Sequence, residues 1–260
     1  MRGISKALIA TGVVAVAFSG PVLATHSWDG THWLRTSNSE LVVPVGDNVD
    51  DRWDKYLRAA VVGWNKSTVI QSPIVPGKTP PAKCRMVPGT IQVCNFAYGP
   101  TGWLGLASIV LSNNHISAAT AKMNDTYANT SNNTPTWWHY VMCQEIGHGY
   151  GLDHQDENSN NPNLGTCMDY PADPKGNDQP NAHDYEMLLT IYNHVESAMV
   201  VMSPGASAGF ELGNTPNDWG RPTKFDSLRR PIEFVRVISP TEKVLTHVTW
   251  ATGQGPRGRF

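Results

Sequence analysis

The chain has 260 residues, 40% of them hydrophobic and 16% charged, and a formal net charge of −2 at pH 7. This length and composition can bury a full core, so they predict one globular, enzyme-sized unit with room for an appendage. Because the net charge is mildly acidic and Lys and Arg do not cluster in the sequence, nucleic acid and anionic lipid surfaces are excluded as main partners.

The first 24 residues have the pattern of a cleaved secretion signal peptide. Arg2 and Lys6 precede an apolar run over 7–18, and the residues at 22 and 24 fit the two positions that a signal peptidase reads. The alternative, a membrane anchor, is disfavoured because the run is shorter than the roughly 20 residues that span a bilayer. Cleavage leaves 18 Lys and Arg against 22 Asp and Glu, a net charge of −4. We expect a secreted, extracellular monomer that has no membrane association after cleavage.

Residues 31–45 predict a strand region, broken at 37–39, and residues 51–69 predict an amphipathic helix that packs on a sheet. Asp51 is the expected N-cap of this helix. Apolar residues recur in it at spacings of three and four: Trp53, Tyr56, Leu57, Ala60, Val61 and Trp64. The acidic loop at 46–51 could bind Ca²⁺, but a capped loop entering the helix is favoured, so calcium is unsupported.

The middle of the chain predicts further strands. Residues 85–97 indicate a short hairpin that turns at 88–89. The apolar run at 102–111 indicates a strand, and its glycines are typical of close approach by another backbone. We interpret 112–134, rich in Asn, Ser and Thr, as strand ends and loop.

Two helices and a terminal hairpin are expected in the second half. Thr134 as N-cap and Pro135 at the first helical position begin one helix. Asn181 and Asp184 are close to a capping box that begins the other. Residues 203–230 are rich in Pro, Gly and Asn and predict a linker. Residues 234–250 predict a hairpin turning at 240–242, followed by a tail.

The most informative stretch is CQEIGHGYGLDH, from Cys143 to His154, followed by GTCMDY at 165–170. If 137–149 is helical, Gln144 and His148 lie on one face, with Glu145 about 100° around the axis. Gly151 would let the chain leave the helix with φ > 0 and return His154 to the same point. This geometry is typical of a metal site.

Four cysteines in an exported chain indicate two disulfides, for which three pairings are possible. The favoured pairing joins Cys84 to Cys94, which closes a local loop, and Cys143 to Cys167, which ties the motif helix to the turn at 165–170. The alternative is a free Cys143 that acts as a soft metal ligand beside Gln144.

The motif resembles the signature H-E-x-x-H-x-x-G-x-x-H of the metzincin zinc peptidases, and Met168 fits the methionine-bearing turn of that clan. Asp184 followed by Ile191 and Tyr192 is similar to the end of the matrixin branch. From Trp33 through the terminal hairpin the chain resembles small secreted bacterial matrixin-like metallopeptidases. The departure is Gln144, which stands where the family has its first ligand histidine.

The resemblance implies an α+β fold with a twisted mixed sheet, an active-site helix and a C-terminal helix after the Met-turn. It divides the chain into a signal peptide (1–24), a catalytic domain (25–200) and a linker, hairpin and tail (201–260). It also implies a secreted zinc endopeptidase that acts on extended peptide or protein substrates. No room is left for an inhibitory pro-domain after residue 24, so we expect activity directly after signal removal.

The resemblance further assigns the site residues. One catalytic Zn²⁺ would be bound by Gln144, His148 and His154, and Glu145 would be the general base. Tyr170, as in the S-x-M-x-Y turn of astacins and serralysins, would stabilise the oxyanion. The edge strand that receives the substrate would comprise Trp103, Leu104, Gly105 and Leu106.

Gln144 leaves two functions open, because a neutral amide oxygen binds zinc less well than an imidazole nitrogen does. The first is a working peptidase, with Gln144 as a ligand or with Asp156 completing the set of ligands. The second is a secreted binding protein that keeps the peptidase fold without turnover. Glu145 favours the enzyme, since a binding module has no evident need for a buried carboxylate beside two histidines.

Overall fold

The computed structural model describes residues 26–127, 134–197 and 211–256, so the expected signal peptide lies outside the described residues. No helix within these ranges is both long and apolar enough to cross a membrane. The elements, in chain order, are β1 (His32–Trp33), β2 (Leu41–Val42), β3 (Val45–Asn48), α1 (Asp54–Trp64), β4 (Ile70–Gln71), β5 (Ile74–Pro76), β6 (Ile91–Phe96), β7 (Trp103–Ser112), β8 (His115–Asn124), a 3₁₀ turn (Asp125–Tyr127), α2 (Pro135–Gly149), α3 (Ala182–Tyr192), α4 (Pro216–Trp219), β9 (Arg221–Phe225), β10 (Pro231–Ser239) and β11 (Glu242–Trp250).

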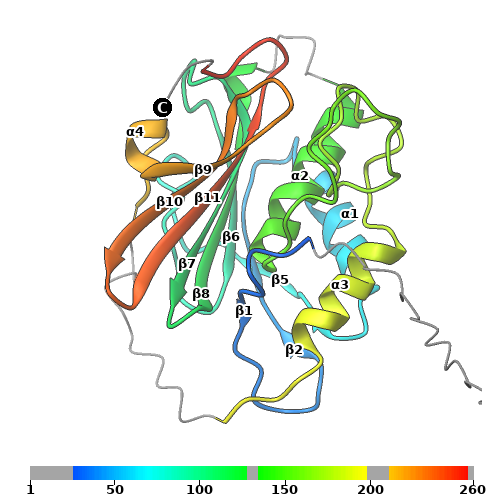
Figure 1. Cartoon of the computed structure of the whole chain (residues 1–260), viewed down its shortest axis with the longest axis vertical. Helices are drawn as coiled ribbons and strands as arrows, with labels where there is room; N and C mark the ends of the chain where they lie inside the picture. The colour runs from blue at the N-terminus through cyan, green and yellow to red at the C-terminus, as the bar shows by residue number, and fades with distance from the viewer. Residues whose placement is uncertain (1–25, 128–133, 198–210, 257–260) are drawn as a thin grey trace, which may run out of the picture.

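Nine of the described strands form one twisted mixed sheet, in which the main path runs β5-β3-β6-β8-β7-β11-β10-β9 and β1 pairs with β8 (Figure 1). The pairs β3–β5, β3–β6, β6–β8 and β1–β8 are parallel. The pairs β8–β7, β7–β11, β11–β10 and β10–β9 are antiparallel. Strands β2 and β4 form a separate parallel pair. The expected α+β class with a mixed sheet is therefore confirmed.

The central strands β7 and β8 are buried at all ten positions of each strand, because both faces of the sheet are covered. Side chains alternate between the faces of a strand, and Ile109 and Leu111 pack in the core with residues of α1 and α2. Trp103, Leu106 and Val110 point into a second core, closed by the C-terminal segment. Figure 1 shows α1, α2 and α3 together on one side of the sheet.

Three sequence-based element predictions are wrong. Helix α1 begins at Asp54 with Trp53 as N-cap, because the Asp50 carboxylate rather than Asp51 caps the preceding turn at the Arg52 amide. Residues 85–90 do not form one arm of a hairpin, because β6 finds parallel partners in β3 and β8 instead. The polar run at 115–124 is the central strand β8, whose small Ala, Ser and Thr side chains fit between two covered faces.

The prediction of a linker at 203–230 is also wrong for the residues of this range that the structure describes. Residues 203–210 lie outside the described residues, but α4 and β9 follow them, and Trp219 is fully buried in the second core. Through β11 the hairpin joins the main sheet at β7. The segment after 211 is therefore integrated in the fold and is not appended to it.

Both predicted disulfides are present. Cys84 pairs with Cys94, and Cys143 pairs with Cys167, which ties α2 to the turn that carries Met168. No cysteine is free, so the alternative of Cys143 as a metal ligand is wrong.

Candidate metal centre

Helix α2 carries the motif and has defined ends. Thr134 is the N-cap, its Oγ1 accepts a hydrogen bond from the Trp137 amide, and Pro135 is the first helical residue, as predicted. Beyond the helix Gly151 has φ +90°, the turn that the sequence predicted. A Cβ at Gly151 would lie 2.2 Å from the Thr31 carbonyl oxygen, so the turn needs glycine for space as well as for its backbone angle.

Three buried histidines meet at one point: His148 from α2, His154 from the following loop and His247 from β11. Their ring centroids are 5.0 Å (His148–His154), 4.0 Å (His148–His247) and 4.3 Å (His154–His247) apart. One nitrogen from each lies within 4.8 Å of the others. Nε2 of His148 and both ring nitrogens of His154 and His247 are buried without a hydrogen-bond partner among the described residues.

Burial and hydrogen bonding leave these imidazoles with ring nitrogens that can bind a cation. His148 Nδ1 donates to the Leu152 carbonyl oxygen at 2.8 Å, which leaves the lone pair of Nε2 directed away from that bond. Trp28 stacks on the same ring at 5.2 Å. Burial lowers the pKa of His148 to about 4 and holds the pKa values of His154 and His247 well below the usual range. Neutral imidazoles whose free ring nitrogens meet at one point are a donor set that zinc accepts, so the residues fit the ion that the motif predicts.

The sequence analysis missed His247. It lies 93 residues after His154, and no local spacing connects the two. The only signal was its place in an apolar strand, on the same alternating face as Leu245 and Thr249. A histidine on the buried face of such a strand is unusual, but the partner strand could not be known in advance.

Gln144, the predicted first ligand, is held by other contacts. Its Nε2 donates towards the Tyr140 hydroxyl (2.7 Å) and the carbonyl oxygens of Cys167 (3.0 Å) and Asp169 (2.9 Å). Its Oε1 accepts from Thr249 Oγ1 at 2.6 Å. The amide therefore links α2 to the Met168 turn and to β11, and its one potential donor atom to a metal is engaged.

Glu145 lies beside the histidines and is completely buried. Its Oε1 is 2.7 Å from Thr249 Oγ1, while Oε2 has no hydrogen-bond partner among the described residues and lies 4.0 Å from His247 Nδ1. Burial raises the pKa of Glu145 to about 8. Thr249 has one hydroxyl hydrogen for two acceptors, Gln144 Oε1 and Glu145 Oε1, so it can donate to only one of them at a time.

Gly105 in β7 makes room for this carboxylate. A Cβ at Gly105 would lie 2.2 Å from Glu145 Oε1 and 2.7 Å from Val141 Cγ1. The strand glycine thus marks a close approach, as expected, but the approaching atoms belong to side chains of α2 rather than to another backbone.

Met168 and Tyr170 flank the centre. The Sδ of Met168 would lie 2.5 Å from a Cβ at Gly147, so the methionine packs directly against α2. The Tyr170 ring is 5.0 Å from that of His154, and its hydroxyl accepts from the Trp250 amide at 3.3 Å. Burial raises the pKa of Tyr170. The roles assigned to both residues remain predictions.

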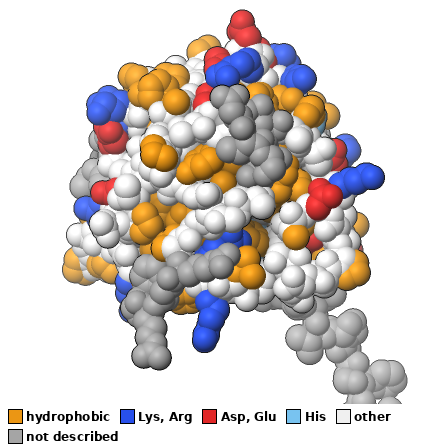
Figure 2. Space-filling model, turned by 90° about the horizontal axis from the view of Figure 1, so that it is seen from above, with side chains coloured by type: hydrophobic (Ala, Val, Ile, Leu, Met, Phe, Trp, Pro, Cys, Tyr) orange, Lys and Arg blue, Asp and Glu red, His pale blue; other side chains and the backbone are white. Residues whose placement is uncertain are grey.

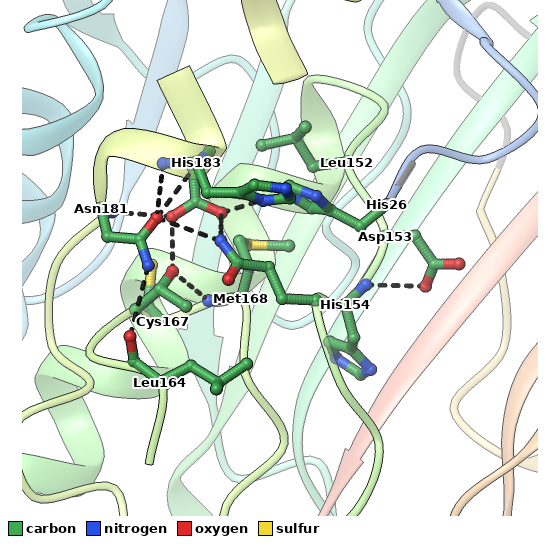
Figure 3. Close-up of polar contacts among 12 residues, drawn as sticks. His26, Leu152, Asp153, His154, Leu164, Cys167, Met168, Asn181 and His183 are labelled. Carbon is green, nitrogen blue, oxygen red and sulfur yellow. Dashed lines mark hydrogen bonds and ion pairs between the residues drawn. The ribbon is translucent and has the colours of Figure 1, made fainter. Parts of the chain in front are cut away.

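A buried polar network fixes the segment between His154 and Met168, and Figure 3 shows it beside both residues. The Asp184 carboxylate, fully buried in α3, accepts from the Asn181 amide (2.7 Å) and from Gln155 Nε2 (2.9 Å) and pairs with His26 Nε2 (3.1 Å). The capping box expected at the start of α3 is confirmed. Asp156, the alternative ligand, caps its own loop by accepting from the Asn158 amide.

The predicted substrate edge is not free in this structure. Strand β7 pairs with β8 on one side and with β11 on the other, from Trp103↔Trp250 to Ser112↔Glu242. Of the residues expected to receive a peptide, Trp103, Gly105 and Leu106 have register partners in β11, and Leu104 lies at the register shift between them. Because His247 and Thr249 belong to β11, the strand that covers this edge also completes the histidine cluster.

A cavity of about 130 Å³ adjoins the centre next to Tyr170 and Thr249, with Trp137, Arg230 and Trp250 among its lining residues. On the face seen in Figure 2, Lys and Arg side chains are dispersed among Asp and Glu and do not form one basic patch.

No protein-family model matches the chain, and no curated protein matches it. Among solved structures it is similar to high choriolytic enzyme 1, a hatching enzyme zinc-protease from Oryzias latipes (medaka fish), at 14% identity and a TM-score of 0.36, over 64% of this chain and 96% of that chain. It is also similar to two structures of myroilysin, one at 11% identity and a TM-score of 0.35 over 63% of this chain and 83% of the other. The second match has 13% identity and a TM-score of 0.33, over 63% and 86%.

Proposed function

We propose that the chain is a zinc-dependent peptidase in which His148 and His154 bind the ion, His247 is the third ligand while β11 is paired with β7, and Glu145 is the general base. The observation that carries the proposal is the carboxylate oxygen Oε2 of Glu145, buried and unpartnered beside three histidines that each have at least one unpartnered ring nitrogen. Zinc bound by three protein ligands polarises a carbonyl and lowers the pKa of a bound water to about 7. Glu145 would take the proton of the attacking water and return it to the leaving amine.

Tyr170 is the candidate group for the oxyanion. Its hydroxyl accepts from the Trp250 amide, and a hydroxyl that accepts one hydrogen bond can still donate its own hydrogen. Its ring centroid lies 5.0 Å from that of His154, which supports this role. A donor in such a position stabilises negative charge that develops on a carbonyl oxygen.

We infer that the structure is a closed form. Extended peptides bind sheet edges by backbone pairing, and the edge of β7 is already paired with β11. If β11 leaves, Gln144 Oε1 loses its Thr249 partner and becomes available as a donor atom. Gln144 would then replace His247, and the expected substrate edge at 103–106 would open.

The first test is zinc content and casein hydrolysis of the purified chain beside Glu145→Ala and His148→Ala. We expect His148→Ala to lose one zinc equivalent and Glu145→Ala to keep it while hydrolysis is lost. If zinc binds to the centre but the chain and the Gln144→His variant hydrolyse nothing, the chain is a metal-binding protein without turnover. If Glu145→Ala hydrolyses casein as well as the original chain, the assignment of the base is wrong.

The closed form has its own test, a disulfide between β7 and β11. Ser108 and Thr246 are register partners whose hydroxyl oxygens are 3.0 Å apart, so the double variant Ser108→Cys, Thr246→Cys is the choice for this cross-link. We expect the oxidised double variant to lose hydrolysis while keeping its zinc. The two single variants are the controls and should stay active. Full activity of the locked chain would show that β11 does not have to move.

A further inference from the structure

A second cluster of metal-binding side chains lies outside the proposed active centre and shares no residue with it. His32 is in β1, His115 begins β8, and His194 and Glu196 follow α3. His32 and His115 are register partners in the parallel β1–β8 pair. Three segments far apart in the sequence therefore bring three imidazoles and one carboxylate together. We call these four residues the His32 cluster.

The nitrogen and oxygen atoms of the His32 cluster converge. Glu196 Oε2 lies 2.8 Å from His115 Nε2 and 3.6 Å from His32 Nε2, and Glu196 Oε1 lies 3.6 Å from His194 Nε2. The Nε2 atoms of His32 and His194 are 3.1 Å apart. In a tetrahedral site with metal–ligand distances of about 2.0–2.1 Å, neighbouring ligand atoms are roughly 3.3 Å apart. His32, His115 and Glu196 each offer one ligand atom within 4.8 Å of the others, and His194 Nε2 lies beside His32 Nε2 and Glu196 Oε1 at the exposed side.

The orientation of His32 suits a metal ligand. Its Nδ1 lies 2.7 Å from the Gly30 carbonyl oxygen, and only the nitrogen can donate in that pair. Nδ1 therefore carries a hydrogen, which leaves Nε2 as the nitrogen that points to the cluster and can bind a metal. A backbone carbonyl behind a histidine in this manner is the usual support of a metal ligand.

Burial is graded across the His32 cluster in a way that suits entry of an ion. The side chains of His115 and His32 are 11% and 13% exposed, Glu196 is 23% exposed and His194 is 44% exposed. The inner two ligands come from the sheet, and the outer two come from the segment after α3. Glu196 is positioned further by its amide, which donates to the Arg35 carbonyl oxygen at 2.9 Å.

We propose that the His32 cluster is a second zinc site. Three imidazoles and one carboxylate are ligands that zinc accepts in four-coordinate sites, and all four positions are supplied by the protein. A site with no open position is structural. The ion would fasten β1 and the segment after α3 to β8, and its binding free energy would add to the stability of the fold.

The test uses the purified chain, stripped of metal and reloaded with Zn²⁺, and counts bound zinc by mass spectrometry. We expect two equivalents in the original chain. His115→Ala and the milder Glu196→Gln should each lose the zinc of the His32 cluster and keep the zinc of the active centre. His148→Ala should lose the zinc of the active centre and keep the zinc of the His32 cluster. His139→Ala is the matched control, a histidine outside both clusters, and should bind two.

Thermal unfolding with and without Zn²⁺ provides a readout that does not depend on activity. Added zinc should raise the melting temperature of His148→Ala, in which only the His32 cluster can bind, and should not raise that of a variant that combines His148→Ala with Glu196→Gln. Co²⁺ reloaded into His148→Ala should give the visible absorption of a four-coordinate site.

The proposal is overturned if the chain binds one zinc that His115→Ala and Glu196→Gln leave in place, because the His32 cluster is then an ion-pair cluster only. It is also overturned if a second zinc persists in both variants. The two proposed sites can fail separately. A single zinc that Glu196→Gln removes and His148→Ala keeps would support the His32 cluster and refute the active centre.

Discussion

Substitution of His247 is expected to weaken zinc binding at the active centre far more than substitution of Gln144. His247 offers an unpartnered ring nitrogen to the cluster, whereas Gln144 Oε1 is occupied by Thr249. Loss of a residue that only supports ligands costs about 10 to 100-fold in metal affinity, so loss of a direct ligand should cost at least about 100-fold. A factor of 100 corresponds to about 2.7 kcal/mol.

The assay is competition for zinc with a chromophoric chelator. It uses His247→Gln and Gln144→Leu in a Glu196→Gln background, so that only the active centre binds zinc. We expect a loss of at least about 100-fold for His247→Gln and a smaller loss, about tenfold, for Gln144→Leu. Unfolding of each metal-free variant controls for a general loss of stability. If Gln144→Leu loses more affinity than His247→Gln, Gln144 is the ligand in the closed form and the reasoning is wrong.

Three further predictions concern the scaffold. Gly105→Ala places a Cβ against Glu145 Oε1 and should lower the free energy of unfolding by about 1–3 kcal/mol, measured by chemical denaturation. An unchanged denaturation midpoint would mean that α2 can shift to make room for the methyl group. Asp184→Ala removes a buried carboxylate that accepts several hydrogen bonds and should cost about 3 kcal/mol or more, whereas the surface variant Asp173→Ala should cost little. Burial lowers the pKa of Lys122 from 10.5 to about 8, so between these pH values the unfolded chain binds more protons than the folded chain does. The free energy of unfolding should therefore increase by up to about 3 kcal/mol as the pH rises through this window. Lys122→Met should lack that gain, and equal pH profiles of the two chains would contradict it.

Features that depend on local sequence could be predicted, and features that depend on long-range pairing could not. Thr134 and Pro135 fix the start of α2 by themselves, and Gly151 fixes its exit, because caps and left-handed turns are decided by a few neighbouring residues. The disulfide pairing that was favoured among three possible ones is the pairing in the structure. Strand β8 was missed because its Ala, Ser and Thr residues suit a central strand only once both faces are covered.

The candidate site divides in the same way. His148 and His154 come from one motif of eleven residues and could be predicted, and the structure brings them together. His247 belongs to β11, whose partner strand β7 begins more than 130 residues earlier. The local sequence pattern does not predict that these two strands pair. The His32 cluster depends on the β1–β8 register and on the path of the chain after α3, so it was equally hidden from sequence reasoning.

The most direct test of the central claim is a crystal structure of the zinc-loaded chain with anomalous data collected at the zinc absorption edge. The account predicts an anomalous peak bonded to Nε2 of His148 and to ring nitrogens of His154 and His247, with Glu145 close by and not bonded to the ion. A peak bonded to Gln144 while β11 stays on β7 and His247 is unliganded, or no peak between His148 and His154, would contradict it.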